Sequence, residues 1–245
     1  MVILRLIGLV PAAGSGTRAG GALPRQYVDL DGMPLLARTV QRLLTALTFE
    51  RLYVVVTDED AHVRRALAAF GEPVAVLPCG GPTRAATVRN AAHALAPQLG
   101  AMDWLLVHDA ARPCVPVETL RRLMTAVAND PVGALLAVPV ADTLKRTDGN
   151  DPPRVHRTEA RARLWQAQTP QVFRWGVLQR ALALPAAADV TDEAQAVELL
   201  AAGGGCALPR LVPGSTQNIQ VTYPADLALA AAILAMQVAG LEPPH

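Results

Sequence analysis

The chain has 245 residues, 51% of them hydrophobic, with 22 Lys and Arg against 21 Asp and Glu and a formal net charge of +1. This length and apolar content suit one large α/β domain with a small appendage, and the near-neutral charge argues against an extended nucleic-acid or membrane-binding surface. The sequence also lacks an uninterrupted apolar run of transmembrane length.

The first feature along the chain is a glycine-rich loop that follows an apolar run. Residues 4–10 are predicted to form a buried strand, and the next segment reads P-A-A-G-S-G-T-R-A-G-G-A-L-P-R-Q-Y. Gly14 and Gly16 leave the backbone open to a ligand, and successive N–H groups in such a turn bind anions. Arg18 and Arg25 add two positive charges, so we predict that this loop binds a nucleoside triphosphate.

Three other interpretations of this loop are weaker. A Walker loop requires G-K-[ST] after its glycines, and the sequence has none here. A dinucleotide fingerprint is matched by Gly14, Gly16 and Ala19, but it must open a helix, which the glycines and proline of residues 20–24 would break. A turn without a ligand explains the glycines but not the two arginines.

Helical and strand-like patterns alternate through the rest of the chain. Helices are predicted at 34–47, 58–70, 115–128, 190–200 and 224–238, and strands at 52–56, 73–77, 104–107, 133–138, 206–212 and 218–221. This alternation predicts an α/β fold with a doubly wound, mainly parallel sheet. Ligands of such sheets bind beyond the carboxyl ends of the strands, here the loops after Val10, Leu77, Val107 and Val138.

The loop after Leu77 reads C-G-G-P-T-R-A-A-T-V. Gly80 and Gly81 free the backbone, and Thr83 is predicted to cap the helix that follows. A helix N-terminus that faces a cleft is a good site for an anion or polar ligand. Taken by itself, this pattern favours an ordinary capped helix without a ligand.

The strand at 104–107 ends in H-D-A-A-R-P. Asp109 is placed to bind Mg²⁺, ribose hydroxyls or a substrate hydroxyl. Arg112 is placed either to bind a phosphate or to form a structural ion pair with Asp109. His108 is interpreted as a packed residue at the strand end and not as a base.

The second half contains a change of composition. From Asp142 to Arg163 the chain is polar and arginine-rich, with Gly149 and two prolines at the middle, which predicts an exposed hairpin arm at 140–163. Farther on, T-D-E-A is interpreted as helix capping by Thr191, with two acidic residues that favour the helix dipole.

Together the segments P-A-A-G-S-G-T-R, L-P-R-Q-Y, H-D-A-A-R-P and Q-T-P-Q-V-F resemble the 2-C-methyl-D-erythritol 4-phosphate cytidylyltransferases of the sugar-nucleotidyltransferase superfamily. They occur in family order over nearly the whole chain. The resemblance implies a single Rossmann-like nucleotidyltransferase domain over residues 1–245. It also implies transfer of CMP from CTP to 2-C-methyl-D-erythritol 4-phosphate, with release of pyrophosphate, in the non-mevalonate isoprenoid pathway.

The resemblance also implies roles for individual residues. The catalytic cations would be Arg18 and Arg25. The nucleotide would be bound by Pro11, Ala12, Ala13, Gly14, Gly16, Gly81, Arg84, Thr87, Asp109 and Ala110. The acceptor would be positioned by Asp109, Arg112, Thr143, Arg161, Thr169 and Gln220. Mg²⁺ would be held mainly by the triphosphate, without a certain protein ligand.

A homodimer follows from the same resemblance. The arm at 140–163 would hook round the arm of a second subunit, and Thr143 and Arg161 would reach the partner's site. We expect no nucleic-acid or membrane partner. Three cysteines without metal-site spacing, Cys79, Cys114 and Cys206, favour a reducing, cytoplasmic environment.

Three positions depart from the family pattern. Arg25 and Gln220 stand where lysines are usual, and Pro82 replaces an acidic residue. Arg25 keeps the charge and fits a chain whose basic residues include a single lysine, whereas Gln220 loses a charge near the substrate phosphate. Two alternatives therefore stay open: a cytidylyltransferase for another polyol phosphate such as ribitol 5-phosphate, and a non-catalytic nucleotide-binding dimer.

Overall fold

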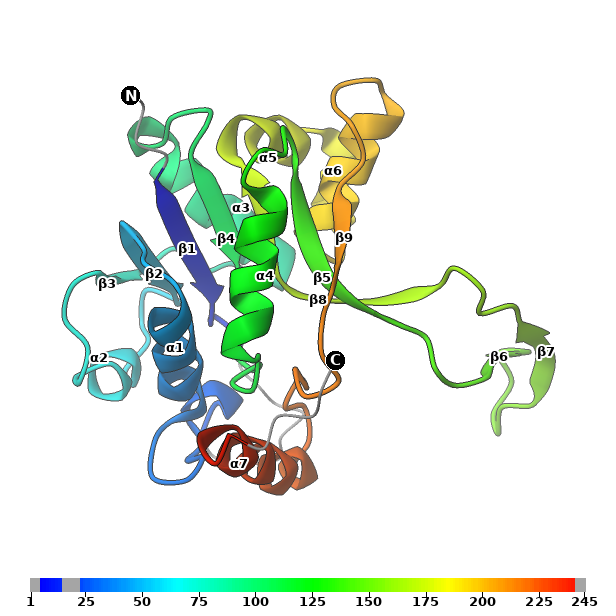
Figure 1. Ribbon diagram of the computed structural model, residues 1–245, viewed down its shortest axis with the longest axis horizontal. Helices are drawn as coiled ribbons and strands as arrows, with labels where there is room; N and C mark the ends of the chain where they lie inside the picture. Colours follow the sequence, from blue (N-terminus) through cyan, green and yellow to red (C-terminus); the bar gives the residue numbers. More distant parts are fainter. Residues whose placement is uncertain (1–4, 15–22, 241–245) are drawn as a thin grey trace.

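A seven-stranded sheet forms the centre of the computed structural model, which describes residues 5–14 and 23–240 (Figure 1). Its strands are β1 (Leu6–Pro11), β2 (Arg51–Val55), β3 (Val74–Leu77), β4 (Trp104–Val107), β5 (Gly133–Pro139), β8 (Trp165–Arg174) and β9 (Arg210–Pro213). They lie in the order β3-β2-β1-β4-β8-β5-β9, and only the pairings of β8 with β4 and β5 are antiparallel. The predicted mainly parallel α/β sheet is therefore confirmed.

Helices cover both faces of this sheet. The helices are α1 (Leu35–Ala46), α2 (Val63–Ala66), α3 (Arg84–Leu95), α4 (Val117–Val127), α5 (Trp175–Leu182), α6 (Glu193–Ala202) and α7 (Pro224–Val238), with short 3₁₀ turns η2 (Arg25–Tyr27), η3 (Ala96–Gln98) and η4 (Pro185–Asp189). The core is divided accordingly: α1 and α4 pack on one face, and α3, α5 and α6 on the other (Figure 1). Strand β1 contributes side chains to both halves of the core, because Leu9 and Val10 point to opposite faces of the sheet. Helix α7 lies on neither face and packs in a separate cluster with Leu30, Leu35 and Cys114 (Figure 1).

Two predicted elements are wrong because backbone groups that a regular element would need bind other partners. The helix expected at 58–70 is reduced to α2. At its start, Asp60 Oδ1 accepts the N–H groups of His62 and Val63 at 2.9 Å and forms a turn, and beyond its end the N–H of Phe70 donates to the carbonyl three residues earlier, that of Leu67. The strand expected at 218–221 is irregular, because the backbone N–H groups of Asn218 and Ile219 donate to carbonyls of the preceding turn, those of Ser215 at 3.1 Å and Gln217 at 2.8 Å, and not to a neighbouring strand.

Smaller corrections concern the ends of two other elements. The strand expected at 206–212 begins only at Arg210. The cap of α6 is Asp192 and not the predicted Thr191, because Asp192 Oδ1 accepts the N–H of Gln195 at 2.9 Å.

The predicted arm is present and projects away from the sheet (Figure 1). It consists of β6 (Leu144–Thr147) paired antiparallel with β7 (Val155–Glu159). Its strands are almost wholly exposed, and polar contacts join them, such as Lys145 Nζ to Thr158 Oγ1 at 2.8 Å. Among the helices of the described residues, none combines the length and apolar character needed to cross a membrane.

Candidate active site

The loops after β1, β3 and β4 enclose a hollow of about 160 Å³, here called the nucleotide hollow. It lies at the carboxyl ends of these strands, where the parallel topology predicts ligand binding. Its lining contains most of the nucleotide-binding residues predicted from the sequence: Pro11, Ala12, Ala13, Gly14, Gly81, Arg84, Thr87, Asp109 and Ala110, together with Arg25 and Gln220. Two other predicted residues, Gly16 and Arg18, lie outside the described residues.

The glycine-rich loop is held in place by a residue to which sequence reasoning gave no role. Gln26 is 7% exposed, and its Nε2 donates to the carbonyl oxygens of Ala12 at 2.8 Å and Gly14 at 3.0 Å. Both N–H groups of the amide are thereby used, and two loop carbonyls are tied to one side chain. The signal was present in the motif L-P-R-Q-Y, but only the fold shows what the glutamine contacts.

The β3–α3 loop forms the facing wall. Thr83 caps α3 as predicted, accepting the N–H of Ala86 at 3.1 Å. Thr87 is 2% exposed, and its hydroxyl accepts the N–H of Gly81 at 3.0 Å and donates to the carbonyl of Thr83 at 2.9 Å. The Thr87 hydroxyl thus fixes its own loop. A Cβ built on Gly80 would lie 2.3 Å from the Cβ of Ala13. The loops after β1 and β3 therefore approach so closely that position 80 has no room for a side chain.

Four charged side chains are connected beside the nucleotide hollow, and two of them, Arg84 and Asp109, belong to its lining. Arg84 Nε donates to Asp109 Oδ1 at 2.7 Å, and Arg112 Nε approaches Asp109 Oδ2 at 3.4 Å. Arg84 also forms two hydrogen bonds, of 2.8 and 2.9 Å, to the carboxylate of Glu193. Sequence reasoning placed Glu193 in a capping motif and missed this contact, because the two residues are 109 positions apart.

These ion pairs set the charge of the site. Burial alone would raise the pKa of Asp109, but Arg84 and Arg112 outweigh it and hold the pKa below its usual value. Burial raises the pKa of Glu193, and Arg84 opposes that rise. For His108, burial lowers the pKa to about 4, so its ring is neutral at pH 7. This fits the prediction that His108 is a packed residue and not a base.

The predicted acceptor residues are divided between the sheet and the arm. A second hollow of about 310 Å³, here called the acceptor hollow, is lined by Arg84, Asp109, Arg112, Ala167, Gln168, Thr169, Gln171, Thr191, Asp192 and Gln220. It shares Arg84, Asp109 and Gln220 with the nucleotide hollow, so the two meet at Asp109.

Three of the predicted acceptor residues make contacts around Asp109. Thr169 is 4% exposed, and its hydroxyl oxygen accepts the N–H of Asp109 at 3.0 Å. Arg112 donates from Nη1 to the carbonyl of Asn218 at 2.8 Å, and its Nη2 lies 3.4 Å from Gln220 Oε1. Arg112 therefore pairs with Asp109 and still faces the acceptor hollow.

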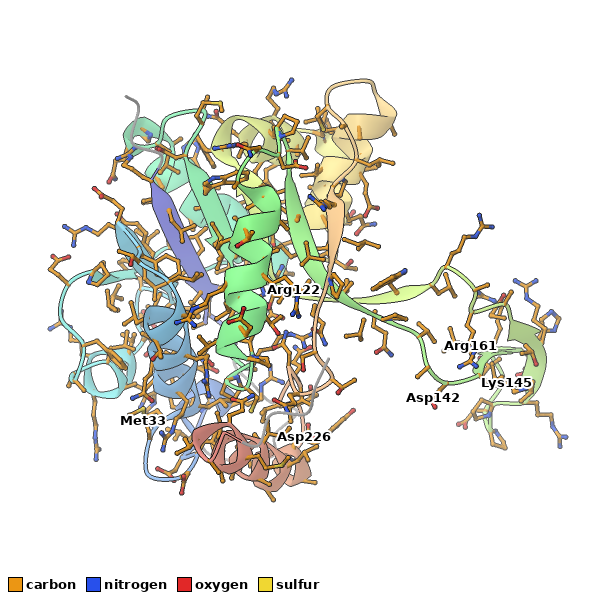
Figure 2. The ribbon with its side chains drawn as sticks, viewed as in Figure 1. Met33, Arg122, Asp142, Lys145, Arg161 and Asp226 are labelled. Atoms are coloured by element: carbon orange, nitrogen blue, oxygen red, sulfur yellow. The ribbon has the colours of Figure 1, made fainter. Side chains whose placement is uncertain are left out.

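The remaining two residues lie elsewhere in the fold. Thr143 and Arg161 are exposed and line neither hollow, and Figure 2 shows Arg161 on the arm, away from the sheet. Within one chain, the structure does not bring them to Asp109.

The described part of the site is suited to group transfer between anions. Arginines and backbone groups line it, and its histidine is buried and neutral. Such a site can stabilise negative charge that develops on phosphoryl oxygens without a covalent intermediate on the protein. Within residues 5–14 and 23–240, no three His, Cys, Asp or Glu side chains are grouped to hold a metal ion.

Comparison with known proteins points to one family. The family model described as "IspD: 2-C-methyl-D-erythritol 4-phosphate cytidylyltransferase" matches residues 6–236. A protein of that name from Thiobacillus denitrificans is 48% identical over 94% of this chain and 98% of its own length. One from Azoarcus is 49% identical over 94% of each chain.

Solved structures show the same similarity. A crystal structure of 4-diphosphocytidyl-2C-methyl-D-erythritol synthase covers 96% of this chain and all of its own, with 38% identity and a TM-score of 0.81. The structure of the Francisella tularensis cytidylyltransferase is 31% identical and covers 94% of this chain and 99% of its own, with a TM-score of 0.76.

Proposed function

This chain belongs to the 2-C-methyl-D-erythritol 4-phosphate cytidylyltransferase family, and we propose that it transfers CMP from CTP to 2-C-methyl-D-erythritol 4-phosphate. The products are 4-diphosphocytidyl-2-C-methyl-D-erythritol and pyrophosphate, and the reaction serves isoprenoid precursor synthesis by the non-mevalonate pathway. The observation that carries this function is the meeting of two hollows at Asp109, between Arg84 and Arg112. One hollow suits the nucleotide and the other the phosphorylated acceptor.

The reaction joins the acceptor phosphate to the α-phosphorus of CTP. An oxygen of the acceptor phosphate attacks in line, and the bond to the β-phosphate oxygen breaks as pyrophosphate leaves. No protein base is required because the attacking phosphate is already an anion, which fits a site whose histidine is neutral and buried. Arg25 lines the nucleotide hollow, where a fixed cation stabilises the charge that grows on the α-phosphate in the transition state. Arg18, in the same loop, is assigned the same role by family resemblance.

Mg²⁺ is proposed as the cofactor, held mainly by the triphosphate. Among the described residues that line the nucleotide hollow, Asp109 carries the carboxylate, and both of its oxygens face arginines. This donor set fits an ion that keeps phosphate and water ligands better than one enclosed by protein ligands. When bound, the ion would neutralise charge on the leaving pyrophosphate.

The functional unit is proposed to be a homodimer joined through the arm at 140–163. This is supported by the exposure of Arg161 and Thr143, which lie outside both hollows of their own chain although the family resemblance assigns them to the acceptor. A second subunit would bring its arm to that hollow. A cytoplasmic location is proposed as well, supported by three unpaired cysteines.

The test of this function is pyrophosphate release with CTP and Mg²⁺, with 2-C-methyl-D-erythritol 4-phosphate, ribitol 5-phosphate or no acceptor. Release with the first compound alone is expected. Release only with ribitol 5-phosphate would move the activity to another polyol phosphate. CTP binding without release from either acceptor would favour a non-catalytic nucleotide-binding protein.

A further inference from the structure

Glu193 carries a buried carboxylate that its own helix does not need. It is the first residue of α6 and is 2% exposed. The cap of this helix is Asp192, which accepts the N–H of Gln195. Burying a charge is costly unless a partner compensates it, so the carboxylate of Glu193 serves a group outside α6.

That group is Arg84, the first residue of α3. Its Nη1 and Nη2 donate to Oε1 and Oε2 of Glu193 at 2.8 and 2.9 Å, which is a bidentate pair. Its Nε donates to Oδ1 of Asp109 at 2.7 Å. Because the guanidinium is planar and rigid, fixing both terminal nitrogens also fixes the direction of Nε. Glu193 therefore determines how Arg84 meets Asp109.

Glu193 itself lines neither hollow, whereas Arg84 and Asp109 line both. The four side chains Glu193, Asp109, Arg84 and Arg112 carry two negative and two positive charges, which balance. Without the negative charge of Glu193, Nη1 and Nη2 of Arg84 would lose their partner, and the guanidinium would be free to turn out of its present contact with Asp109 or towards a bound phosphate. The carboxylate of Asp109 would then lose its orientation towards the substrates.

We propose that Glu193 is a positioning residue for cytidylyl transfer, acting through Arg84 to hold Asp109 and the start of α3 in the arrangement that receives both substrates. The role rests on the proposed function. It differs from helix capping, which Asp192 performs, and from substrate contact, which Arg84 and Asp109 make.

The test is a double-mutant cycle with Glu193→Gln and Arg84→Met, read out by CTP affinity from calorimetry and by kcat/KM for the acceptor. Glu193→Gln is expected to weaken CTP binding roughly tenfold, the scale of a lost charge-assisted hydrogen bond. In the double variant, Glu193→Gln should lower CTP affinity by less than about a further twofold relative to Arg84→Met alone, because the partner of Glu193 is already absent. Glu193→Asp, which keeps the charge but has a shorter reach, should lie between. Glu198→Gln, the same change at an exposed site on α6, should match the parent.

Two results would overturn the proposal. One is unchanged CTP affinity and kcat/KM in a folded Glu193→Gln protein; the other is full additivity with Arg84→Met. If Glu193→Gln fails to fold, parent-like values for Glu193→Asp would have the same force. If the parent protein binds CTP but releases no pyrophosphate, the proposed cytidylyl transfer is refuted. The role of Glu193 can still be tested in that case, because the double-mutant cycle is also measured by CTP affinity. A parent that does not bind CTP would refute both.

Discussion

Thr169 Oγ1 and His108 Nδ1 share a buried hydrogen bond of 3.0 Å directly behind Asp109. The other ring nitrogen of His108, Nε2, lies 3.0 Å from the carbonyl of Arg112 and must carry the proton, because a carbonyl only accepts. A neutral ring then leaves Nδ1 as an acceptor, so the Thr169 hydroxyl donates to it. The same hydroxyl oxygen accepts the N–H of Asp109, and a neutral His108 thereby supports the site.

The first prediction concerns pH. The pKa of His108 falls from 6.5 to about 4 on folding because the ring is buried, so between these values the unfolded chain binds more protons than the folded one. Its contribution to the free energy of unfolding is fully present above pH 6.5 and is lost as the pH falls towards 4, a change of about 3 kcal/mol. Urea titrations over this range should show a shallower pH dependence for His108→Gln than for the parent. His156→Gln, at an exposed position on the arm, is the control, and an equal slope for parent and His108→Gln would contradict the prediction.

A second prediction tests the role of Gln26. Gln26→Met keeps the length of the side chain but removes both hydrogen bonds to the glycine-rich loop, and Gln26→Glu places a carboxylate against two carbonyl oxygens. We expect CTP affinity to fall by about 1 to 3 kcal/mol in the first variant and by more in the second. Calorimetry with CTP measures both values. CTP affinities equal to that of the parent in both variants would show that these hydrogen bonds do not shape the loop.

Gly80 provides a third prediction. An alanine there would put its Cβ 2.3 Å from that of Ala13 and 2.9 Å from the backbone of Val56, so two walls of the nucleotide hollow must move apart. Overpacking of this kind costs about 1 to 3 kcal/mol of stability, and CTP binding should weaken as well. Gly71→Ala is the matched control, because no atom lies within 4 Å of its added Cβ. The free energies of unfolding of both variants measure this difference. Equal values would contradict the prediction that a side chain at position 80 is overpacked.

The fourth prediction concerns Gln220, which lines both hollows. A lysine there supplies the charge that the family resemblance predicts and places a second cation beside Arg112 in the proposed acceptor hollow. Gln220→Lys should lower the acceptor KM by a factor corresponding to about 1 to 3 kcal/mol. Gln41→Lys adds the same charge on the exposed side of α1 and should leave KM unchanged. An unchanged or raised KM for Gln220→Lys would refute the expectation.

The fifth prediction tests whether the arm acts on a partner. Arg161→Ala damages only the arm, and Arg25→Ala damages only the nucleotide hollow. If the arm serves the other subunit, a mixed dimer combines an intact hollow with an intact arm at one of its two sites. Mixed dimers isolated by two affinity tags should therefore recover about half of the parent activity. Activity no higher than that of the two single variants would show that each arm serves its own chain.

Much of the fold was determined by the sequence alone, because its signals are local. Apolar periodicity located α1, and Pro224 marked the start of α7, each nearly to the residue, and proline, glycine and arginine content marked the arm. The parallel topology then placed the nucleotide hollow at the carboxyl ends of β1, β3 and β4. Each inference required only a short window of residues or a rule of sheet topology.

Strand β8 shows where such windows fail. The sequence predicted no strand at 165–174, and a proline within the run argues against one. In the fold, β8 lies antiparallel between β4 and β5, and its pairing with β5 is irregular next to Thr169. The irregularity coincides with the point where this strand contributes Gln168 and Thr169 to the acceptor hollow.

Only the tertiary structure decided the contacts that organise the site. The pairing of Arg84 with Glu193 spans 109 positions, and that of Asp109 with Thr169 spans 60. Both depend on the insertion of β8 beside β4 and on the packing of α6 against the same sheet face as α3. A charged or polar side chain looks alike in sequence whether it caps a helix, faces solvent or supports a buried partner. The difference lies in the burial and distance that the whole fold imposes.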